Sequence, residues 1–277
     1  MHPLAFQLGP FKVTWYGVMM ATAFLAGLWT ASRRGLRDKI APETVLDLGP
    51  WLIVGAIIGA RTLYVITFWR EQFASKPLYE VVMVQHGGLV YYGGLIGASI
   101  AVIVYTRLKK FPLWKAADVL APSIALGYVF GRIGCLMNGC CYGRACDLPW
   151  AIRYPQPADP TTYSGPPPGV LLHPTQIYES LLSLLLYGFL AWLYRRKKFD
   201  GQVFAAYLIC YPIVRSFVEL FRGDYPDYQR FFGWATPAQA VSAGILAAGL
   251  LLVALLPRRS TGYGEPVAKA QAKAKSS

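Results

Sequence analysis

Residues 237–256 read PAQAVSAGILAAGLLLVALL, an apolar run that contains no charged side chain. A run of about 20 such residues is long enough for an α-helix to cross the hydrocarbon core of a bilayer. The basic pair Arg258-Arg259 follows it almost directly, as is typical of the cytoplasmic end of a membrane span. This stretch alone predicts an integral membrane protein.

Other apolar runs of similar length occur along the whole 277-residue chain. Hydrophobic residues make up 55% of the sequence and charged residues only 15%, against about 25% charged residues in a typical soluble domain. We therefore predict an all-α, polytopic integral membrane protein with about seven transmembrane helices. The predicted spans are residues 14–32, 48–69, 89–106, 116–135, 177–194, 202–221 and 237–256.

Lysine and arginine residues determine the predicted orientation. They cluster after the first, third and fifth spans and in the tail, for example at Arg33-Arg34 and Arg195-Arg196, and such clusters favour the cytoplasmic side. We therefore predict an outside amino terminus, a cytoplasmic carboxyl terminus and an extracytoplasmic loop at about 136–173. The predicted organisation is a single seven-helix membrane domain over 1–256 and a basic, disordered tail over 257–277. Because topology accounts for the net charge of +13, we expect no nucleic-acid partner.

Charged side chains also occur inside the predicted spans, where each costs about 2.5–3.5 kcal/mol. In the sixth span, Tyr211, Arg215, Glu219 and Arg222 recur every three or four residues, so they share one face of a helix. Arg215 and Glu219 alone are compatible with a structural ion pair. The longer polar stripe favours a hydrated cavity over a lipid-facing surface.

The fourth span ends in the segment Gly131-Arg132-Ile133-Gly134, which Asn138 and Gly143 follow. Glycine lets a ligand approach the backbone closely, and arginine suits an anion. The segment matches neither a P-loop nor a dinucleotide-binding motif. It indicates an anion site of unspecified kind.

Three further segments bring polar side chains to the ends of predicted spans. His-Pro-Thr-Gln-Ile-Tyr-Glu at 173–179 opens the fifth span, with His173 either a helix cap or a site residue. Tyr92 enters the third span beside Gly93 and Gly97, whose spacing favours tight helix packing. Tyr16 begins the first span, where aromatic residues are common at the membrane interface.

Four of the five cysteines crowd together as Cys135, Cys140, Cys141 and Cys146. The absence of a C-x-x-C spacing argues against a zinc site, so we predict no metal. A disulfide on an oxidising outer face stays an alternative. We favour the interpretation that these cysteines are small side chains whose role is packing.

Together these motifs, in this order along nearly the whole chain, resemble the phosphatidylglycerol–prolipoprotein diacylglyceryl transferase family. The resemblance implies an enzyme of the bacterial inner membrane that needs no cofactor and whose active site faces the extracytoplasmic side. Its lipid substrate is phosphatidylglycerol in the bilayer. It moves the diacylglyceryl group to the cysteine thiol of a prolipoprotein signal peptide, which forms a thioether and releases glycerol phosphate.

The resemblance also implies roles for individual residues. Arg132 and Arg215 hold the lipid headgroup, and Glu219 orients Arg215. The implied catalytic residues are Arg132, Arg215, Glu219, Tyr16 and Tyr92, and the implied substrate-binding residues are Asn138, Gly143, His173, Gln176, Tyr178, Glu179, Tyr211 and Arg222.

The chain departs from the family pattern at three positions. Many members have histidine at the position of Tyr92, asparagine at that of Cys135 and glutamate at that of Cys140. Because a phenol is a much weaker base than an imidazole, the base that activates the thiol stays unassigned. Two alternatives also stay open: a carrier or channel for an anionic small molecule, and a paralogue with altered or lost transferase activity.

Overall fold

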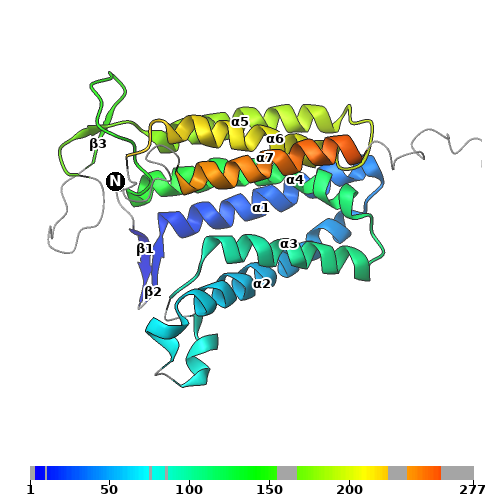
Figure 1. The fold of residues 1–277 in the computed structure, drawn as a ribbon, viewed down its shortest axis with the longest axis horizontal. Coiled ribbons are helices and arrows are strands. Elements are labelled where there is room, and N and C mark those ends of the chain that lie inside the picture. Colours follow the sequence, from blue (N-terminus) through cyan, green and yellow to red (C-terminus); the bar gives the residue numbers. More distant parts are fainter. Residues whose placement is uncertain are drawn as a thin grey trace, which may run out of the picture. The chain divides into compact units, whose positions relative to one another are not determined.

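The structure, a computed structural model, describes residues 4–9, 11–74, 77–84, 87–154, 167–223 and 236–256. Over these residues the chain is mostly helical, with two short antiparallel hairpins (Figure 1). The predicted tail at 257–277 and residues 155–166 of the predicted outer loop lie outside the described residues. Disorder of the tail stays a prediction.

Seven α-helices of 18 residues or more form the described part of the chain. They are α1 (Trp15–Gly35), α2 (Pro42–Thr67), α3 (Tyr91–Leu108), α4 (Leu113–Asn138), α5 (Thr175–Tyr194), α6 (Gln202–Glu219) and α7 (Pro237–Leu255). The shorter helices are η1 (Leu36–Asp38), η2 (Trp69–Phe73) and η3 (Leu78–Val82). Each long helix overlaps one predicted span.

Five of the long helices, α2, α3, α4, α5 and α7, are long and apolar enough to cross a membrane. In α6, the charged pair Arg215 and Glu219 makes the helix less apolar. The prediction of a polytopic, mostly helical membrane protein is therefore confirmed. That α1 and α6 also cross, which would make seven spans, stays a prediction, as does the orientation of the termini.

Local sequence explains where several helices begin. At α7, the Thr236 hydroxyl accepts a hydrogen bond from the Gln239 backbone N–H while the Gln239 side chain accepts one from the Thr236 N–H. This capping box satisfies backbone donors that the first helical turn leaves unpaired. α6 follows Gly201, whose φ of 92° lies in the left-handed region that glycine adopts without strain.

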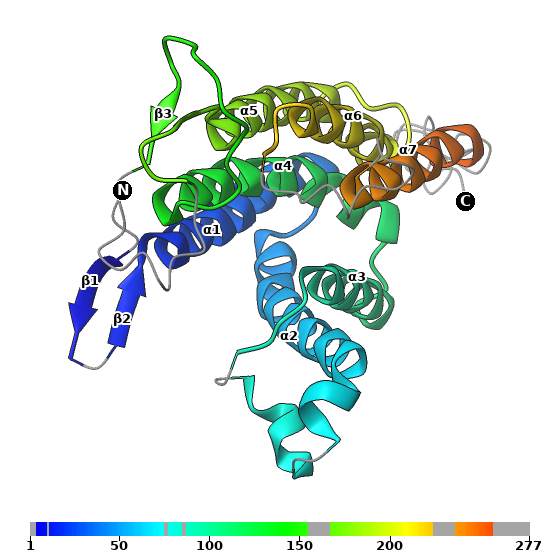
Figure 2. The same ribbon diagram turned by 60° about the vertical axis from the view of Figure 1, so that its left-hand side comes forward.

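The chain forms two compact units, and the division between them falls inside α1 and α4. Unit 1 comprises Met1–Gly27 and Leu120–Ser277, and unit 2 comprises Leu28–Val119. In unit 1, α6 packs against both α5 and α7 (Figure 2). The single seven-helix domain over 1–256 stays a prediction.

In unit 2, α2 and α3 pack through glycines. A Cβ atom added at Gly59 or Gly97 would overlap backbone atoms of the facing helix, and one added at Gly93 would overlap the Gly59 carbonyl oxygen. Only glycine allows two helix backbones to approach this closely. The interpretation of Gly93 and Gly97 as packing residues is therefore confirmed.

Two hairpins add strands that the all-α prediction did not contain. β1 (Leu4–Leu8) pairs antiparallel with β2 (Phe11–Thr14), and β3 (Ile152–Arg153) pairs with β4 (Leu171–Leu172). The sequence did not reveal them because strands of two to five residues show too little periodicity. β3 and β4 pair across a sequence separation of almost twenty residues, within the predicted outer loop.

Candidate functional site

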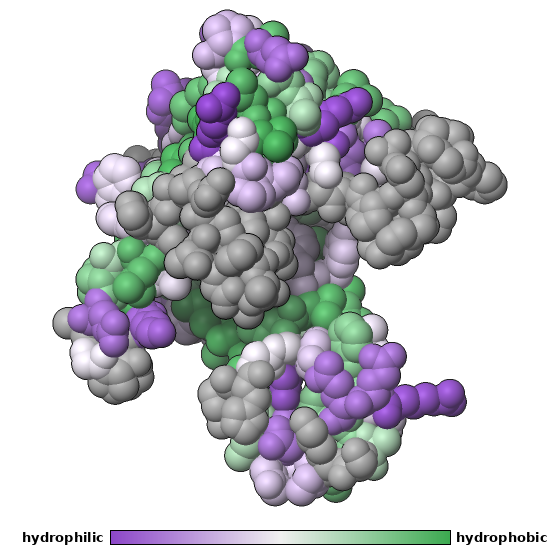
Figure 3. Space-filling model, turned by 90° about the vertical axis from the view of Figure 1, so that its left-hand side faces the viewer, coloured by the Kyte–Doolittle hydropathy of each residue, from purple (hydrophilic) through white to green (hydrophobic). Residues whose placement is uncertain are grey.

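The candidate site lies in unit 1, where α4 and α6 end and α5 begins. Gly143, just after α4, forms an isolated β-bridge with Arg222, just after α6. The two helix ends are therefore neighbours. Figure 3 views the molecule from this end, and its upper part shows hydrophilic and apolar side chains mixed over the connecting segments.

Arg132 on α4 and Glu179 on α5 form a bidentate ion pair. Arg132 Nε lies 2.9 Å from Glu179 Oε2, and Nη2 donates to Oε1 at 3.0 Å. The Glu179 side chain is 1% exposed and that of Arg132 14% exposed. Two parallel bonds between planar groups fix the guanidinium in orientation as well as position. The sequence singled out both residues but did not predict that they pair.

Arg215 and Glu219 form a second ion pair, within α6. Arg215 Nη1 lies 2.6 Å from Glu219 Oε2, so the predicted contact between them is present. The alignment does not make a hydrogen bond, however. Among the described residues, Arg215 Nη1 and both Glu219 carboxylate oxygens are buried without a hydrogen-bond partner. Two of these atoms, Arg215 Nη1 and Glu219 Oε2, are paired with each other by charge, so Glu219 Oε1 is the atom that is costly to bury unless a ligand or water satisfies it.

A pair of tyrosines links the helices that carry the two arginines. Tyr211 on α6 donates a hydrogen bond to the Tyr128 hydroxyl on α4 at 2.8 Å. Each tyrosine precedes an arginine by one helical turn, and the Arg132 guanidinium lies 5.9 Å from the Tyr128 ring centre. Tyr128 is not among the predicted site residues, although its spacing of four residues from Arg132 is a usable signal.

Both arginines therefore lie between the same two inter-helix contacts. Going towards the ends of α4 and α6, the Tyr128–Tyr211 hydrogen bond comes first, then Arg132 and Arg215, then the Gly143–Arg222 bridge. Because both helices run towards this end, their arginines occupy the same stretch of unit 1.

The segment after α4 packs closely against the chain around His173. Gly143 N–H donates to the His173 carbonyl at 3.0 Å, and Arg144 N–H donates to the Phe221 carbonyl at 2.9 Å. A Cβ atom at Gly143 would meet the His173 Cβ at 2.5 Å and two carbonyl oxygens at 2.7 Å. Gly143 thus permits a close backbone contact, which is a structural reason for glycine at this predicted substrate-binding position.

Buried polar side chains at the start of α5 hold the same segment. Gln176, which is 1% exposed, donates to the Cys140 carbonyl and to the Tyr154 hydroxyl, both at 2.7 Å. The Thr175 hydroxyl donates to the Cys141 carbonyl at 2.8 Å. Gln176 was predicted as a substrate-binding residue, and these contacts give it a positioning role.

His173 and Tyr178 form a small aromatic network. Tyr178 Oη lies 3.2 Å from His173 Nδ1 and accepts a hydrogen bond from Trp150 Nε1 at 2.8 Å. Burial and, second, the positive charge of Arg144 lower the pKa of the His173 imidazole from its usual 6.5. Both causes favour the neutral form of the His173 imidazole.

The remaining predicted residues differ in their placement. Tyr16 is the second residue of α1 and packs against Gly134 on α4, within electrostatic reach of Arg132. Asn138 is the exposed last residue of α4, and its side chain hydrogen-bonds to Cys140. Tyr92 is the exposed second residue of α3 in unit 2. That Tyr92 joins the arginines stays a prediction.

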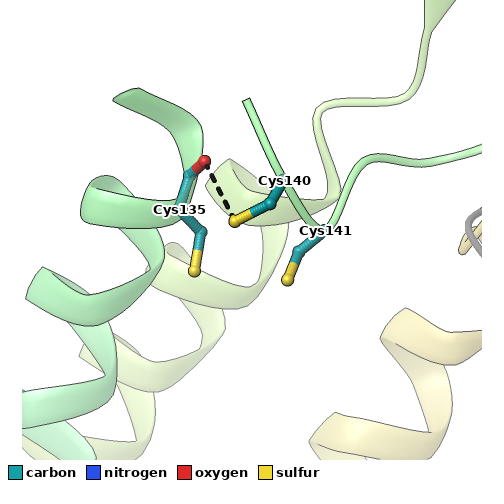
Figure 4. Close-up of side chains that lie close together, drawn as sticks. All are labelled: Cys135, Cys140 and Cys141. Atoms are coloured by element: carbon teal, nitrogen blue, oxygen red, sulfur yellow. Dashed lines mark hydrogen bonds between the residues drawn. The ribbon is translucent and has the colours of Figure 1, made fainter. Parts of the chain in front are cut away.

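Three of the cysteines gather at the end of α4. The Sγ atoms of Cys135, Cys140 and Cys141 lie within 4.8 Å of one another (Figure 4). All five cysteines lie in the described residues and are free thiols, so the structure contains no disulfide among them. The sequence shows four cysteines close together, but no C-x-x-C spacing indicates that the thiols of these three converge.

Comparisons with known proteins give the family. The sequence profile described as "Prolipoprotein diacylglyceryl transferase" matches residues 3–255. The phosphatidylglycerol–prolipoprotein diacylglyceryl transferase of Synechococcus elongatus is 36% identical over 255 residues, covering 90% of this chain and 85% of that protein. Proteins of the same name from Finegoldia magna and Bacillus cytotoxicus are each 36% identical, covering 91% and 95% of this chain and 94% of each relative. The chain, with its arginines near the ends of α4 and α6, therefore belongs to the prolipoprotein diacylglyceryl transferase family.

Proposed function

We propose that this chain transfers the diacylglyceryl group of phosphatidylglycerol to the thiol of the signal-peptide cysteine of a prolipoprotein. The product is a thioether-linked lipid, and the reaction is the first step of lipoprotein maturation. The names of the relatives support both substrates. Family membership favours this activity over the anionic carrier considered from the sequence.

The chemistry is a substitution at a glycerol carbon. The substrate thiolate sulfur forms a bond to the carbon that carries the phosphate ester, and the carbon–oxygen bond breaks. The electron pair of that bond goes to the phosphate oxygen, so glycerol phosphate leaves, and the thiol proton goes to a base or to water. Negative charge moves from sulfur to phosphate, and fixed positive groups at the phosphate stabilise that change.

The observation that carries the proposal is the shared position of Arg132 and Arg215. Both lie between the Tyr128–Tyr211 hydrogen bond and the Gly143–Arg222 bridge. Two guanidinium groups in one stretch of a membrane protein suit a phosphate, because their planar donors match phosphate oxygens.

Each arginine already has a carboxylate partner, so these four groups have no net charge. We propose that the carboxylates position the guanidinium groups and that other N–H donors of the arginines reach the lipid. Of the Arg215 nitrogens, Nη1 is the one in the ion pair with Glu219, so Nε and Nη2 are the donors that this assignment directs at the lipid. Arg222, beside Gly143, adds positive charge at the same helix ends.

We propose that the site faces the extracytoplasmic side of the bacterial inner membrane. Arg195 and Arg196 follow the far end of α5, whereas Glu179 lies in its first turns. By the positive-inside rule, the end with Arg195 and Arg196 is cytoplasmic, so the end with Glu179 is outside. A carboxyl-terminal fluorescent-protein fusion should then be bright and an alkaline phosphatase fusion inactive; the reverse pattern would contradict this orientation.

The activity is tested with purified protein, labelled phosphatidylglycerol and a peptide carrying a lipoprotein-type cysteine. We expect a thioether-linked product from the wild-type protein and from Arg153→Ala, a control at an exposed arginine of β3. We expect little product from Arg132→Ala. Equal product from wild type and Arg132→Ala, or none from wild type, would contradict the proposal.

Complementation tests whether the departures at Tyr92, Cys135 and Cys140 abolish the activity. Expression of this chain should restore growth of bacteria depleted of their own transferase. Failure to restore growth, with the protein present in the membrane, would favour the paralogue with altered or lost activity.

A further inference from the structure

The thiols of Cys135, Cys140 and Cys141 form a cluster to which the proposed transferase reaction assigns no role. Their Sγ atoms lie within 4.8 Å of one another. Cys135 lies in the last turns of α4, and Cys140 and Cys141 lie on the segment that follows (Figure 4). Three sulfur ligands on two adjoining pieces of chain can close around one ion.

The distances suit a metal bound by three sulfurs. Metal–thiolate bonds of about 2.3 Å in a trigonal arrangement place the sulfur atoms about 4 Å apart. The observed separations, at most 4.8 Å, need only a small contraction. Side-chain rotation can supply this, because the thiols are partly accessible and no disulfide holds them.

The backbone beneath two of these thiols is held in place. The Gln176 side chain binds the Cys140 carbonyl, and the Thr175 hydroxyl binds the Cys141 carbonyl. Both side chains are fully buried. The Cys140 thiol also contacts the Cys135 carbonyl at 3.7 Å. The ligands are therefore arranged before an ion arrives, which lowers the entropy that binding must overcome.

The surrounding charges favour an anionic metal–thiolate centre. Arg132 and Arg222 both lie within electrostatic reach of Cys141. Three thiolates around a monovalent ion carry two negative charges, and because Glu179 already neutralises Arg132, the positive charges nearby offset these only in part. Soft ligands such as thiolates select soft ions, and three sulfurs suit a monovalent ion that accepts three ligands.

We propose that Cys135, Cys140 and Cys141 bind one soft, thiophilic metal ion of the copper(I) class at the end of α4. The centre adjoins Arg132, three residues before Cys135 on the same helix. An occupied centre would join α4 to the segment that packs on His173.

The test is a titration of the full-length protein in detergent, reduced and without oxygen, with copper(I) against a chromophoric copper(I) chelator. We expect one ion per chain and, by X-ray absorption, about three sulfur neighbours at about 2.3 Å. Cys146→Ala/Cys210→Ala, which alters the two cysteines outside the cluster, should bind copper(I) like the wild type. Each of Cys135→Ala, Cys140→Ala and Cys141→Ala should weaken binding by tenfold or more, since loss of even an outer-shell partner of a metal site costs about 10–100-fold.

Three results would overturn the proposal. One is equal copper(I) binding by the wild type and by the triple variant Cys135→Ala/Cys140→Ala/Cys141→Ala, provided that both elute as folded protein in size-exclusion chromatography. Another is no binding by wild type at all. The third is a mass two hydrogens lower after mild oxidation, absent when all three cluster cysteines are alanine, together with no copper(I) binding by the reduced protein, which would make the cluster a disulfide site.

Discussion

Arg61 in unit 2 and Arg215 in unit 1 are buried to the same degree, 7% and 8% exposed, but their partners differ. Arg61 donates to the carbonyl oxygens of Glu80, Val81, Gly87 and Gly88 at 2.6–3.2 Å. Its guanidinium also lies within 5.6 Å of the ring centres of Tyr64 and Phe73. Backbone groups and rings therefore satisfy Arg61.

Arg215 contacts a carboxylate that is itself buried. The pair has formal charge balance, and among the described residues Glu219 Oε1 is buried with neither a hydrogen bond nor an ion-pair contact. The sequence marks both arginines equally, as charges inside predicted spans. The contacts of Arg61 hold a connecting segment in place, whereas for Arg215 we propose a role in binding a ligand.

The largest expected effect follows from Arg215→Lys. Lysine keeps the charge and the attraction to Glu219, but it lacks the planar donors that match a phosphate. We expect transfer to fall about 100-fold or more, with little change in melting temperature. Wild-type activity in Arg215→Lys would contradict the proposed difference in role between Arg215 and Arg61. Arg153→Lys serves as the matched control.

Arg61→Lys should have the opposite pattern. An ammonium group cannot reach four carbonyl oxygens that a guanidinium fork reaches together. Unsatisfied carbonyls should lower the free energy of unfolding by about 2–3 kcal/mol, measured as a lower melting temperature. The transfer rate per folded molecule should stay near that of wild type; a loss of activity without a loss of stability would contradict a structural role.

Gly59→Ala tests the close packing of α2 on α3 within unit 2. Because a Cβ atom at Gly59 would overlap the backbone of α3, we expect a loss of about 1–3 kcal/mol in stability. Gly127→Ala in α4 is the matched control, since no atom lies within 4 Å of the added Cβ. There the better helix propensity of alanine should leave stability unchanged or raise it by up to about 1 kcal/mol. Equal effects at both positions would contradict the close approach of α2 and α3.

The smallest expected effect concerns His173. Burial and the Arg144 charge both disfavour the imidazolium, so the pKa of His173 should lie below the usual 6.5 in an NMR titration. Arg144→Ala removes a positive charge and should raise that pKa. The chain has three histidines, so His173→Gln identifies the signal. A midpoint at or above 6.5 would show that neither burial nor Arg144 acts as described.

The helical part of the fold could be predicted from sequence because bilayer thickness sets the length of each apolar run. The polar stripe on α6 could also be predicted, since it depends only on the 3.6-residue period. Arg215 and Glu219, four residues apart, contact each other as that period requires.

Contacts between distant segments could not be predicted in this way. The partner of Arg132 is Glu179, 47 residues away, and neither helix alone indicates the pairing. The hydrogen bond between Tyr128 and Tyr211 spans 83 residues. The cluster of Cys135, Cys140 and Cys141 depends on how the chain turns at Gly139, whose φ is 75°, and not on a familiar cysteine spacing.

The central claim is that Arg132 and Arg215 act on the same lipid phosphate. A double-mutant cycle of Arg132→Lys and Arg215→Lys, read as kcat/KM for phosphatidylglycerol, tests it most directly. If both guanidinium groups bind one phosphate, the double variant should depart from the sum of the two single effects by about 0.5–3 kcal/mol. Effects that add within about 0.3–0.5 kcal/mol would contradict the claim, because they would mean that the two arginines act independently.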